Sequence, residues 1–214
     1  MTERPFPYRH PALRGRQIAV LSIALVLALP AGPVCASNLA DIRQVGENHE
    51  VTLDQTGSSN RAVIEQTATE QISRVKQAGT NLEATVSQTG DSGSVVKELN
   101  QTGSDHLANL TQTGSGGHTL DVTQRGREQT VRAVQAGFGN SANITQRGQG
   151  NEAILNQRGR ENTAIIDQDG RNNRAEVEQR GNDNFADVMQ VGAVKPVHVE
   201  QFGGTTISIR RIGQ

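Results

Sequence analysis

The stretch "QRGQGNEAILNQRGRENTAIIDQDGRNNRAEVEQRGNDNFADVMQ", which runs from Gln146 to Gln190, places a glutamine at every eleventh residue. The spacing continues over most of the chain, and twelve of its fourteen intervals are eleven residues long. Two extra residues precede Gln101, and one precedes Gln124. The glutamines of the series are Gln44, Gln55, Gln66, Gln77, Gln88, Gln101, Gln112, Gln124, Gln135, Gln146, Gln157, Gln168, Gln179, Gln190 and Gln201. A repeat of this regularity constrains the fold more strongly than any single residue does.

Each repeat follows the pattern Q-x-G-x-x-N-x-A-x-[IVL]-x. Glycine stands two residues after the glutamine in fourteen of the fifteen units, and Ala68 is the exception. Asparagine stands five residues after the glutamine in six units, at Asn60, Asn140, Asn151, Asn162, Asn173 and Asn184. The pattern weakens toward the N-terminal half, where His49, Leu82, Gly93 and Gly117 are expected at the asparagine position.

The repeat predicts a β-strand followed by a turn. A right-handed coiled coil also has an eleven-residue period, but a glycine in every unit would cost a helix about 1 kcal/mol each. The apolar positions lie two residues apart, which is the period of a strand. Glycine and asparagine tolerate the left-handed backbone of a tight turn, so the segment x-G-x-x-N is expected to reverse the chain. We therefore expect a strand of about five residues in each unit.

A single unit cannot fold alone. Fixing eleven residues costs about 11–20 kcal/mol of backbone entropy, whereas burying one isoleucine and one alanine returns only about 2–4 kcal/mol. Stacked units offset this deficit because every strand pairs with the strands above and below it. The sequence thus predicts an all-β β-solenoid, with coils of 22 residues built from two units. About seven coils would stack at roughly 4.8 Å each.

The recurring glutamine is predicted to point inward and to form a ladder. Its amide has two donors and an acceptor oxygen, so identical side chains stacked at strand spacing satisfy one another. The asparagine at the corner can do the same. The ladder positions with the clearest pattern are Gln135, Gln146, Gln157, Gln168, Gln179 and Gln190, with Asn140, Asn151, Asn162, Asn173 and Asn184. The turn glycines of the same units are Gly137, Gly148, Gly159, Gly170, Gly181 and Gly192.

Residues 1–36 are interpreted as a signal peptide. A basic start precedes an apolar run, and "VCA" before Ser37 supplies small residues, so cleavage is expected after Ala36. An uncleaved membrane anchor is the alternative, but a run of about twelve apolar residues is shorter than the roughly 20 that a bilayer span needs. Cys35, the one cysteine, would leave with this leader. The remainder divides into a short lead at 37–43, repeats at 44–201 and an arginine-bearing C-terminal segment at 202–214.

Composition disfavours several function classes once the leader is removed. Four arginines and one glutamate leave with it, so 17 basic and 21 acidic residues remain and the net charge is −4. That balance does not favour nucleic acid as a partner. His49, His106, His118 and His198 lie in separate units, without the spacing of a zinc site, and are expected at the surface or at corners. No catalytic or phosphate-binding motif occurs, so we expect neither an enzyme nor a cofactor.

Residues 22 apart should be vertical neighbours in such a stack. Glu152 would then lie on Arg174, and Arg147 on Asp169. Other pairs are like-charged, namely Arg125 over Arg147, Arg158 over Arg180 and Glu178 over Glu200. Exposed ion pairs contribute only about 0–1 kcal/mol each, so the charges bias the assembly without driving it. We interpret them either as a solvated face or as gatekeepers that slow premature aggregation.

The C-terminal "QFGGTTISIRRIGQ" (Gln201–Gln214) breaks the phase of the repeat. Ile207 and Ile209 fall six and eight residues after Gln201, at positions that are outward in the other units. Arg210 is therefore expected to point into the core, and the last coil to stack poorly. In a nucleating subunit, Arg210 and Arg211 would form a basic attachment point for an anionic cell surface or a partner.

The repeat, as in "QAGFGNSANITQ" (Gln135–Gln146) and "QRGQGNEAILNQ" (Gln146–Gln157), resembles that of curlins, the secreted subunits of bacterial curli amyloid fibres. The resemblance extends from Gln44 to Gln201. It implies self-assembly with other curlin subunits into an extracellular, adhesive biofilm matrix at the bacterial cell surface. It also implies export through a dedicated outer-membrane secretion pore with accessory factors.

The charged turns and the arginine-bearing tail are more similar to the minor, nucleating type of curlin subunit. A major fibre subunit is the alternative, although the glycine-rich export segment of major curlins is missing and the chain after the leader has no tyrosine. A soluble β-solenoid adhesin or an ice-binding protein would carry capping segments, and an ice binder would show Thr-x-Thr columns. Neither pattern occurs. A disordered matrix polypeptide would stay unfolded, which circular dichroism on aged protein would reveal.

Overall fold

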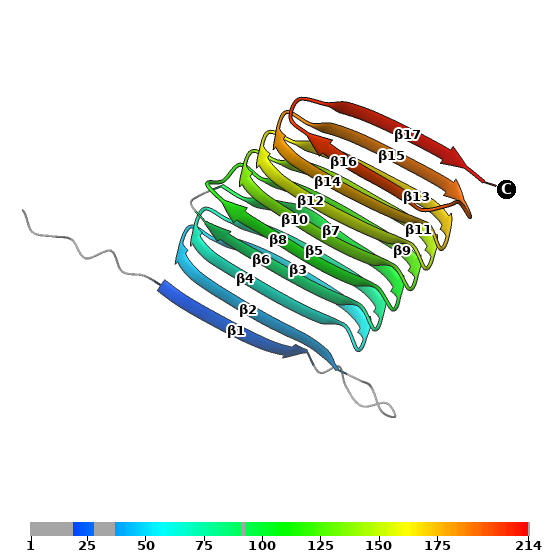
Figure 1. Cartoon of the computed structure of the whole chain (residues 1–214). Coiled ribbons are helices and arrows are strands. Elements are labelled where there is room, and N and C mark those ends of the chain that lie inside the picture. Colours follow the sequence, from blue (N-terminus) through cyan, green and yellow to red (C-terminus); the bar gives the residue numbers. More distant parts are fainter. Residues whose placement is uncertain (1–18, 28–36, 91–92, 214) are drawn as a thin grey trace, which may run out of the picture.

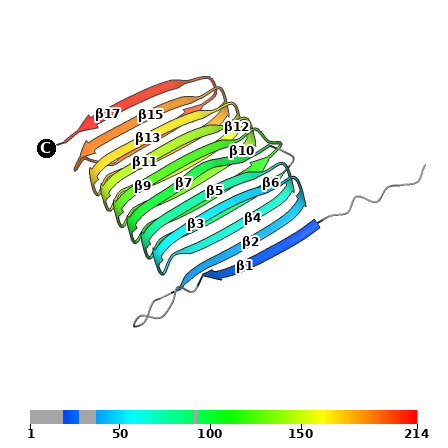
Figure 2. The same cartoon turned by 180° about the vertical axis from the view of Figure 1, so that it is seen from behind.

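The chain folds into one stack of β-strands, seen from two opposite sides in Figures 1 and 2. The structure is a computed structural model, and it describes residues 19–27, 37–90 and 93–213. These residues contain seventeen strands and no helix. The predicted all-β solenoid is confirmed, with two parallel sheets facing each other across a thin core. Strands β2 to β17 make eight coils, where the sequence predicted about seven, because the C-terminal segment supplies one more strand.

The strands alternate between the two sheets along the chain. The first sheet contains β1 (Ala19–Leu27), β2 (Asn38–Glu47), β4 (Arg61–Thr69), β6 (Glu83–Gly90), β8 (Leu107–Gly114), β10 (Thr130–Phe138), β12 (Glu152–Arg160), β14 (Arg174–Asn182) and β16 (Val197–Phe202). The second sheet contains β3 (Glu50–Ser58), β5 (Ile72–Thr80), β7 (Val95–Ser104), β9 (Thr119–Arg127), β11 (Ser141–Gln149), β13 (Thr163–Arg171), β15 (Phe185–Gly192) and β17 (Thr206–Ile212).

Period-two alternation places the small apolar residues and the glutamines inside. In β12, Ala153, Leu155 and Gln157 are buried, while Ile154 and Asn156 between them face outward and are partly exposed. The same alternation occurs in most strands, so the core consists mainly of Ala, Val, Ile and Leu side chains between two rows of glutamine. Strands of one sheet pair in parallel at offsets of 22 residues in the regular part of the chain, as in Gln157 with Gln179.

The strands are eight to ten residues long over most of the stack, longer than the expected five. The difference arises at the glutamine end, where the residues of the turn still pair with the coil above. Gly159 pairs with Gly181, and Arg160 with Asn182, in the same register as the rest of β12. The backbone amides of the turn are therefore hydrogen-bonded along the stack as those of a strand are, which satisfies groups that a loop would leave to solvent.

The chain reversal depends on the expected glycine but not on the expected asparagine. The turn glycine has a positive φ, for example 126° at Gly159. The second residue with positive φ stands four positions after the glutamine, as at Glu161 with 57°, and not at the asparagine that follows it. Asparagine at the corner is thus not required for a left-handed backbone. Its side chain has another role, which is described below.

The two irregular intervals are absorbed locally. Before Gln101, one extra residue forms a bulge in β7, where Val96 and Glu98 pair with the consecutive residues Leu120 and Asp121. The other extra residue lengthens the preceding turn, so that Ser94, not Gly93, takes the corner position. Before Gln124, the added residue again lies in the turn, and His118 replaces Gly117 at the corner. The glutamine columns stay in register past both insertions.

The expectation that Arg210 points into the core is wrong. In β17, Ile207 pairs with Ala186 and Ile209 with Val188, so both isoleucines pack against the core. Arg210 is exposed on the outer face. The physical reason is a shorter turn, in which Thr205 takes the corner position one residue early and restores the alternation. The C-terminal segment therefore forms a regular final strand.

The N-terminal edge of the first sheet carries one antiparallel strand. Strand β1 lies in the apolar run of the expected leader and pairs with β2 from Leu27 opposite Asn38 to Ala19 opposite Gly46. It is the strand drawn in dark blue at one end of the stack in Figure 1. All other strand pairs in the described part of the chain are parallel.

Candidate assembly interface

Two continuous columns of glutamine run along the inside of the stack. In the first sheet Nε2 of each glutamine donates to Oε1 of the next, for example from Gln135 to Gln157 at 2.9 Å and from Gln157 to Gln179 at 2.8 Å. In the second sheet Gln146 donates to Gln168 at 2.8 Å and Gln168 to Gln190 at 2.8 Å. The structure therefore brings the predicted ladder glutamines together in two columns. Each column runs the length of the repeat region, from Gln44 to Gln201 and from Gln55 to Gln190.

The orientation of each amide is fixed by a second hydrogen bond across the core. Nε2 of Gln157 also donates to the backbone carbonyl of Ser141 in the opposite sheet, at 3.1 Å. Since a carbonyl only accepts, the nitrogen must lie on this side of the amide. Nε2 of Gln179 donates to Thr163 O at 2.9 Å in the same way. Every ladder bond in the two columns therefore points in one direction, from each coil toward the next coil along the chain.

The corner asparagines tie coils together mainly through the backbone. Oδ1 of Asn140 accepts the backbone N–H of Asn162, and Oδ1 of Asn151 accepts that of Asn173, at 3.1 and 3.0 Å. The Nδ2 group of Asn151 donates to Arg147 O at 2.8 Å and so closes its own turn. Side chain to side chain bonds join Asn162 to Asn140 and Asn184 to Asn162. The predicted corner residues thus lie in columns, but their principal partner is the main chain.

Histidine replaces asparagine at two corners and uses equivalent atoms. Nδ1 of His106 accepts the backbone N–H of Gln129, and Nδ1 of His118 accepts that of Asn140, each at 3.3 Å. The Nε2 atoms lie 3.1 Å from Thr102 O and 3.0 Å from Thr113 O. This pattern requires the neutral imidazole with its hydrogen on Nε2. Burial lowers the pKa of both His106 and His118 from the usual 6.5, although their backbone hydrogen bonds act in the opposite direction.

Glycine is required in the turn by close stacking as well as by its φ angle. A Cβ atom at Gly137 would overlap the carbonyl oxygen of Gly159, and one at Gly159 would overlap that of Gly181. The obstacle is backbone, which cannot move without breaking the coil pairing. The same contact occurs at Gly148 against Gly170. The turn glycines therefore form two vertical rows in which each backbone lies directly against the next.

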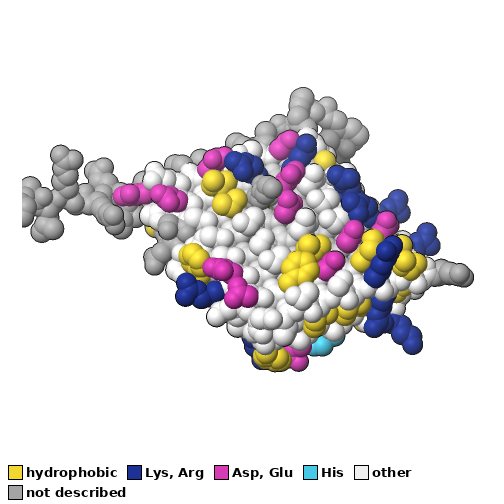
Figure 3. Space-filling model, turned by 90° about the horizontal axis from the view of Figure 1, so that it is seen from above, with side chains coloured by type: hydrophobic (Ala, Val, Ile, Leu, Met, Phe, Trp, Pro, Cys, Tyr) yellow, Lys and Arg dark blue, Asp and Glu magenta, His cyan; other side chains and the backbone are white. Residues whose placement is uncertain are grey.

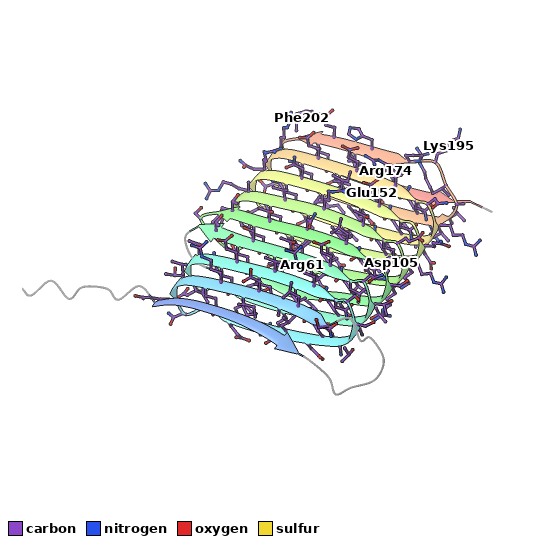
Figure 4. The ribbon with its side chains drawn as sticks, turned by 90° about the horizontal axis from the view of Figure 1, so that it is seen from below. Arg61, Asp105, Glu152, Arg174, Lys195 and Phe202 are labelled. Atoms are coloured by element: carbon purple, nitrogen blue, oxygen red, sulfur yellow. The ribbon has the colours of Figure 1, made fainter. Side chains whose placement is uncertain are left out.

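The outer faces carry charged columns. Glu152 forms ion pairs with Arg174, on the next coil, and with Arg132 at 2.9 Å, as expected for Glu152 over Arg174 (Figure 4). Arg147 pairs in register with Asp169, but its ion pair is with Asp167, at 3.3 Å. The basic and acidic side chains are interspersed on the face seen from above, with the basic ones gathered toward one side (Figure 3).

The three like-charged vertical pairs are also in register. Arg125 lies over Arg147, Arg158 over Arg180, and Glu178 over Glu200.

Exposed arginine side chains cover the two phenylalanines of the turns, with Arg160 at 5.5 Å from the ring centroid of Phe138 and Arg180 at 5.7 Å from that of Phe202. Because these groups are solvent-exposed, each contact contributes little to stability.

The two ends of the stack differ in how the last ladder amides are hydrogen-bonded. At the N-terminal end, Oε1 of Gln55 is buried and accepts no hydrogen bond. At the C-terminal end, Nε2 of Gln201 bonds to Phe185 O and Thr205 O and has no glutamine beyond it. In the second sheet Arg211 pairs with Gln190 at the ladder position, and its side chain is exposed. The N-terminal end of the second sheet therefore presents an unpaired acceptor, whereas both hydrogens of the Gln201 amide are used within the molecule.

Sequence reasoning missed the corner roles of Gln71, Ser94, His118, Gln129 and Thr205. All of them except Thr205 are buried. Each stands directly before the first residue of a strand, and the side chain of that first residue points outward. Gln71 and Gln129 stand at the usual spacing of five residues after a ladder glutamine, whereas Ser94, His118 and Thr205 follow turns of a different length and would have been found by counting back from the next strand. His198 is exposed on β16. No group of three or more His, Cys, Asp or Glu residues in the described ranges is arranged to hold a metal ion, and no helix long and apolar enough to cross a membrane occurs in them.

The fold and its internal ladders define a repeat protein of the parallel β-solenoid class, with open ends. The family described as the curlin associated repeat matches residues 36–67, 119–148 and 148–181. These matches support the curlin family for this chain, and they overlap the two longest runs in which the eleven-residue spacing is unbroken, Gln44–Gln88 and Gln124–Gln201. No curated protein matches the chain.

Proposed function

We propose that this protein is a structural subunit of extracellular curli-like amyloid fibres, which grow by stacking the coils of one copy on those of another. The observation that carries this proposal is that β3, β16 and β17 each have an edge without a further strand in the described residues, and that β2 would join them once residues 1–36 and with them β1 are removed. Gln55 Oε1 has no donor, and Gln201 Nε2 has no ladder acceptor beyond it. A second copy docked at either end would supply the missing partner and pair the free backbone groups of the edge strands.

The proposal includes the setting that the family resemblance implies. The chain would lose residues 1–36, leave the cell through the curli secretion pore with its accessory factors, and assemble at the bacterial cell surface. There it would contribute to adhesion and to the biofilm matrix. The curlin associated repeats and the solenoid fold support a structural role, and neither an enzyme activity nor a cofactor enters the proposal.

The subunit type is proposed from the charges and not from a broken end. The charged turns remain the argument for a nucleating subunit, with Arg158 and Arg180 stacked on one edge and Arg125 and Arg147 on the other. The second argument, an imperfect final coil, no longer applies because β17 packs regularly. Arg210 and Arg211 are exposed and so are available to an anionic surface, but they are equally available to the next copy.

Polymerisation of purified protein tests the proposal. The chain beginning at Ser37 is expected to convert from a mostly disordered monomer to fibres with a cross-β spacing of about 4.7–4.8 Å. Circular dichroism, negative-stain microscopy and fibre diffraction follow the conversion. A folded β-protein that stays monomeric for days would instead support the soluble solenoid adhesin.

A further inference from the structure

The two ends of the stack can meet in two ways, because one coil consists of two similar halves. This inference rests on the proposed end-to-end polymerisation and concerns its register. In the first register, with residues 1–36 and therefore β1 removed, β16 meets β2 and β17 meets β3 of the next copy, which continues each sheet as it is within the molecule. In the second register the copy is rotated by half a coil, so that β16 meets β3 and β17 meets β2. In both, glutamine stays opposite glutamine or Arg211.

Apolar packing does not distinguish the two registers. The inward residues at the C-terminal end are Val197 and Val199 in β16 and Ile207 and Ile209 in β17. At the N-terminal end they are Ala40 and Ile42 in β2 and Val51 and Leu53 in β3. Either sheet of one end presents small or branched apolar side chains to either sheet of the other. The discrimination must come from the outward side chains.

The continuous register places opposite charges together. The internal pairing of Ala175 with Val197 and of Ala40 with Ala62 fixes which residues would face one another. Glu200 then lies on Arg43 of the next copy, and Arg210 lies on Asp54. All four residues are exposed. Glu200 is stacked on Glu178 within the molecule, so a basic partner on its other side relieves a like-charge contact.

The rotated register places like charges together. In that arrangement β16 on β3 brings Glu200 onto Asp54, and β17 on β2 brings Arg210 onto Arg43. Both pairs repel at strand spacing, and opposed like charges on neighbouring strands are destabilising. The same four residues thus favour one register and disfavour the other, which is how natural interfaces achieve specificity.

We propose that copies of this chain stack head to tail in the continuous register, and that Arg43, Asp54, Glu200 and Arg210 select it. The occupant of each end is a second copy of the chain. The direction of the first-sheet ladder agrees with head-to-tail contact, because the amide nitrogen of Gln201 lies toward the C-terminal end and the amide oxygen of Gln44 toward the N-terminal end. Two N-terminal ends placed together would oppose acceptor to acceptor.

Cysteine pairs on the outer faces report the register directly. Thr52, Ser208 and His198 are all exposed. The two ends of one copy lie roughly 34 Å apart, which is too far for a cross-link within one molecule. Ser208 faces Thr52 of the next copy in the continuous register, whereas His198 faces it in the rotated one. Two variants, Thr52→Cys with Ser208→Cys and Thr52→Cys with His198→Cys, are exported from producing cells. Both also carry Cys35→Ser, which removes the native cysteine.

Polymers of each variant are treated with a short dithiol-reactive cross-linker, and linked peptides are quantified by mass spectrometry. We expect the Thr52–Ser208 link to exceed the Thr52–His198 link by on the order of tenfold. Polymer in which the Thr52–His198 link equals or exceeds it would overturn the register and leave the proposed function standing. A dominant Thr52–Thr52 link would show head-to-head contacts and overturn it as well. Failure to polymerise would reject the proposed function and the inference together.

A charge exchange tests whether the four residues cause the selection. Glu200→Arg combined with Arg210→Glu keeps the net charge but makes the rotated register attractive and the continuous one repulsive. This double variant is expected to reverse the ratio of the two cross-links. The matched control is Arg147→Asp combined with Asp167→Arg, which exchanges the charges of an ion pair on internal coils, away from both ends, and should leave the ratio unchanged. An unchanged ratio in the Glu200 and Arg210 variant would contradict the charge-based mechanism.

Discussion

A buried glutamine is unfavourable when it stands alone, because its amide loses water and finds few partners. In this stack the cost disappears, since each amide meets an identical amide in the coil above and a carbonyl across the core. Gln157 illustrates both contacts, with Gln179 Oε1 at 2.8 Å and Ser141 O at 3.1 Å. The value of the residue therefore depends on its neighbours being the same.

Replacing two consecutive ladder glutamines tests this dependence. Gln157→Ala with Gln179→Ala leaves Gln135 Nε2 and Gln201 Oε1 without their ladder partners. Each unsatisfied buried group costs about 1–3 kcal/mol, so fibre growth should slow strongly, as thioflavin fluorescence would record. The control, Asn156→Ala with Glu178→Ala, changes the outward residues next to them. Equal slowing in the two variants would contradict the role of the column.

The turn glycines permit a comparison between backbone strain alone and strain with a clash. Both Gly159 and Gly204 have positive φ, but a Cβ at Gly204 meets nothing within 4 Å, whereas one at Gly159 overlaps Gly181 O. Gly204→Ala should cost about 1–3 kcal/mol through its conformation. Gly159→Ala should cost more, because two coils must separate. Urea dissolution of the assembled protein measures the difference, and similar midpoints for both variants would argue against close stacking.

The corner histidines predict a loss of stability in acid. Because burial lowers the pKa of His106 and His118 below 6.5 in the fold, the unfolded chain binds these protons more tightly. Their contribution is complete above the unfolded value of 6.5 and is lost as pH falls through it toward the lowered folded pKa. Protonation also removes the Nδ1 acceptor that Gln129 and Asn140 use.

Denaturation midpoints from about pH 8 to about pH 5 would record this loss. His106→Asn with His118→Asn should flatten the profile in that window, since asparagine supplies the same acceptor without a charge. His198→Asn, at an exposed residue, is the control and should keep the wild-type profile. A steep profile in the asparagine double variant would assign the pH dependence to other groups.

At the level of residues, the sequence predicted which side chains of the repeats point inward and which residues occupy the corners where the spacing is regular, but not the corners that follow an extra or a missing residue. The inward set follows from period two, which depends only on the local chain, as Ala153 and Leu155 illustrate. Corner identity depends on where an extra residue is absorbed, and that is settled by pairing with neighbouring coils. His118 is at the corner for this reason, although Gly117 has the expected spacing.

At the scale of the element, the coil and not the strand is the cooperating unit. A strand and turn gain most of their hydrogen bonds from the coils on either side, so each element is as stable as its neighbours allow. The final strand follows the same logic. The turn before it is one residue shorter than a regular turn, so Ile207 and Ile209 point inward. Local spacing predicted the direction of these two side chains wrongly because it assumed a turn of fixed length.

Deleting Phe202–Gln214 tests the role of the final strand. The truncation removes β17 and exposes Val197 and Val199, which are buried in the complete chain. We expect it to impair polymerisation, because the core residues of the last coil lose the strand that covers them. Sedimentation of the purified variants would measure the effect.

A second variant separates stacking from surface attachment. Arg210→Ala with Arg211→Ala keeps β17 but removes its basic groups. Release of this variant from producing cells, with polymerisation intact, would support attachment and a nucleating subunit. Impaired polymerisation without release would assign the arginines to contacts between copies.

At the scale of the whole molecule, the N-terminal end is the one at which the expected leader lies. Strand β1 covers β2 along the edge that another copy would need, from Asn38 to Gly46. The second sheet has no such cover, and β3 is its last strand in the described part of the chain. Half of the N-terminal docking edge is therefore blocked while residues 19–27 remain attached.

A chain that keeps its leader should polymerise more slowly than the chain beginning at Ser37. Seeded growth of the two forms at equal concentration measures this, with the rate reduced severalfold because one sheet cannot pair. The control keeps the leader but carries Ser22→Pro and Ala24→Pro, since proline removes ladder hydrogen bonds and disrupts β1. Growth of the proline variant should approach that of the processed chain. If both leader-bearing forms grow equally slowly, bulk rather than β1 pairing is responsible.

The uniform direction of the glutamine bonds has an electrical consequence for a fibre. Backbone carbonyls alternate along a strand, so their dipoles largely cancel, but every ladder amide donates from one coil to the next along the chain. Aligned peptide dipoles add in a helix for the same reason, and here the addition would continue through each copy in a polymer stacked head to tail. Such a filament has a permanent positive and negative pole, so its two tips are chemically different surfaces and incoming subunits do not join them at the same rate.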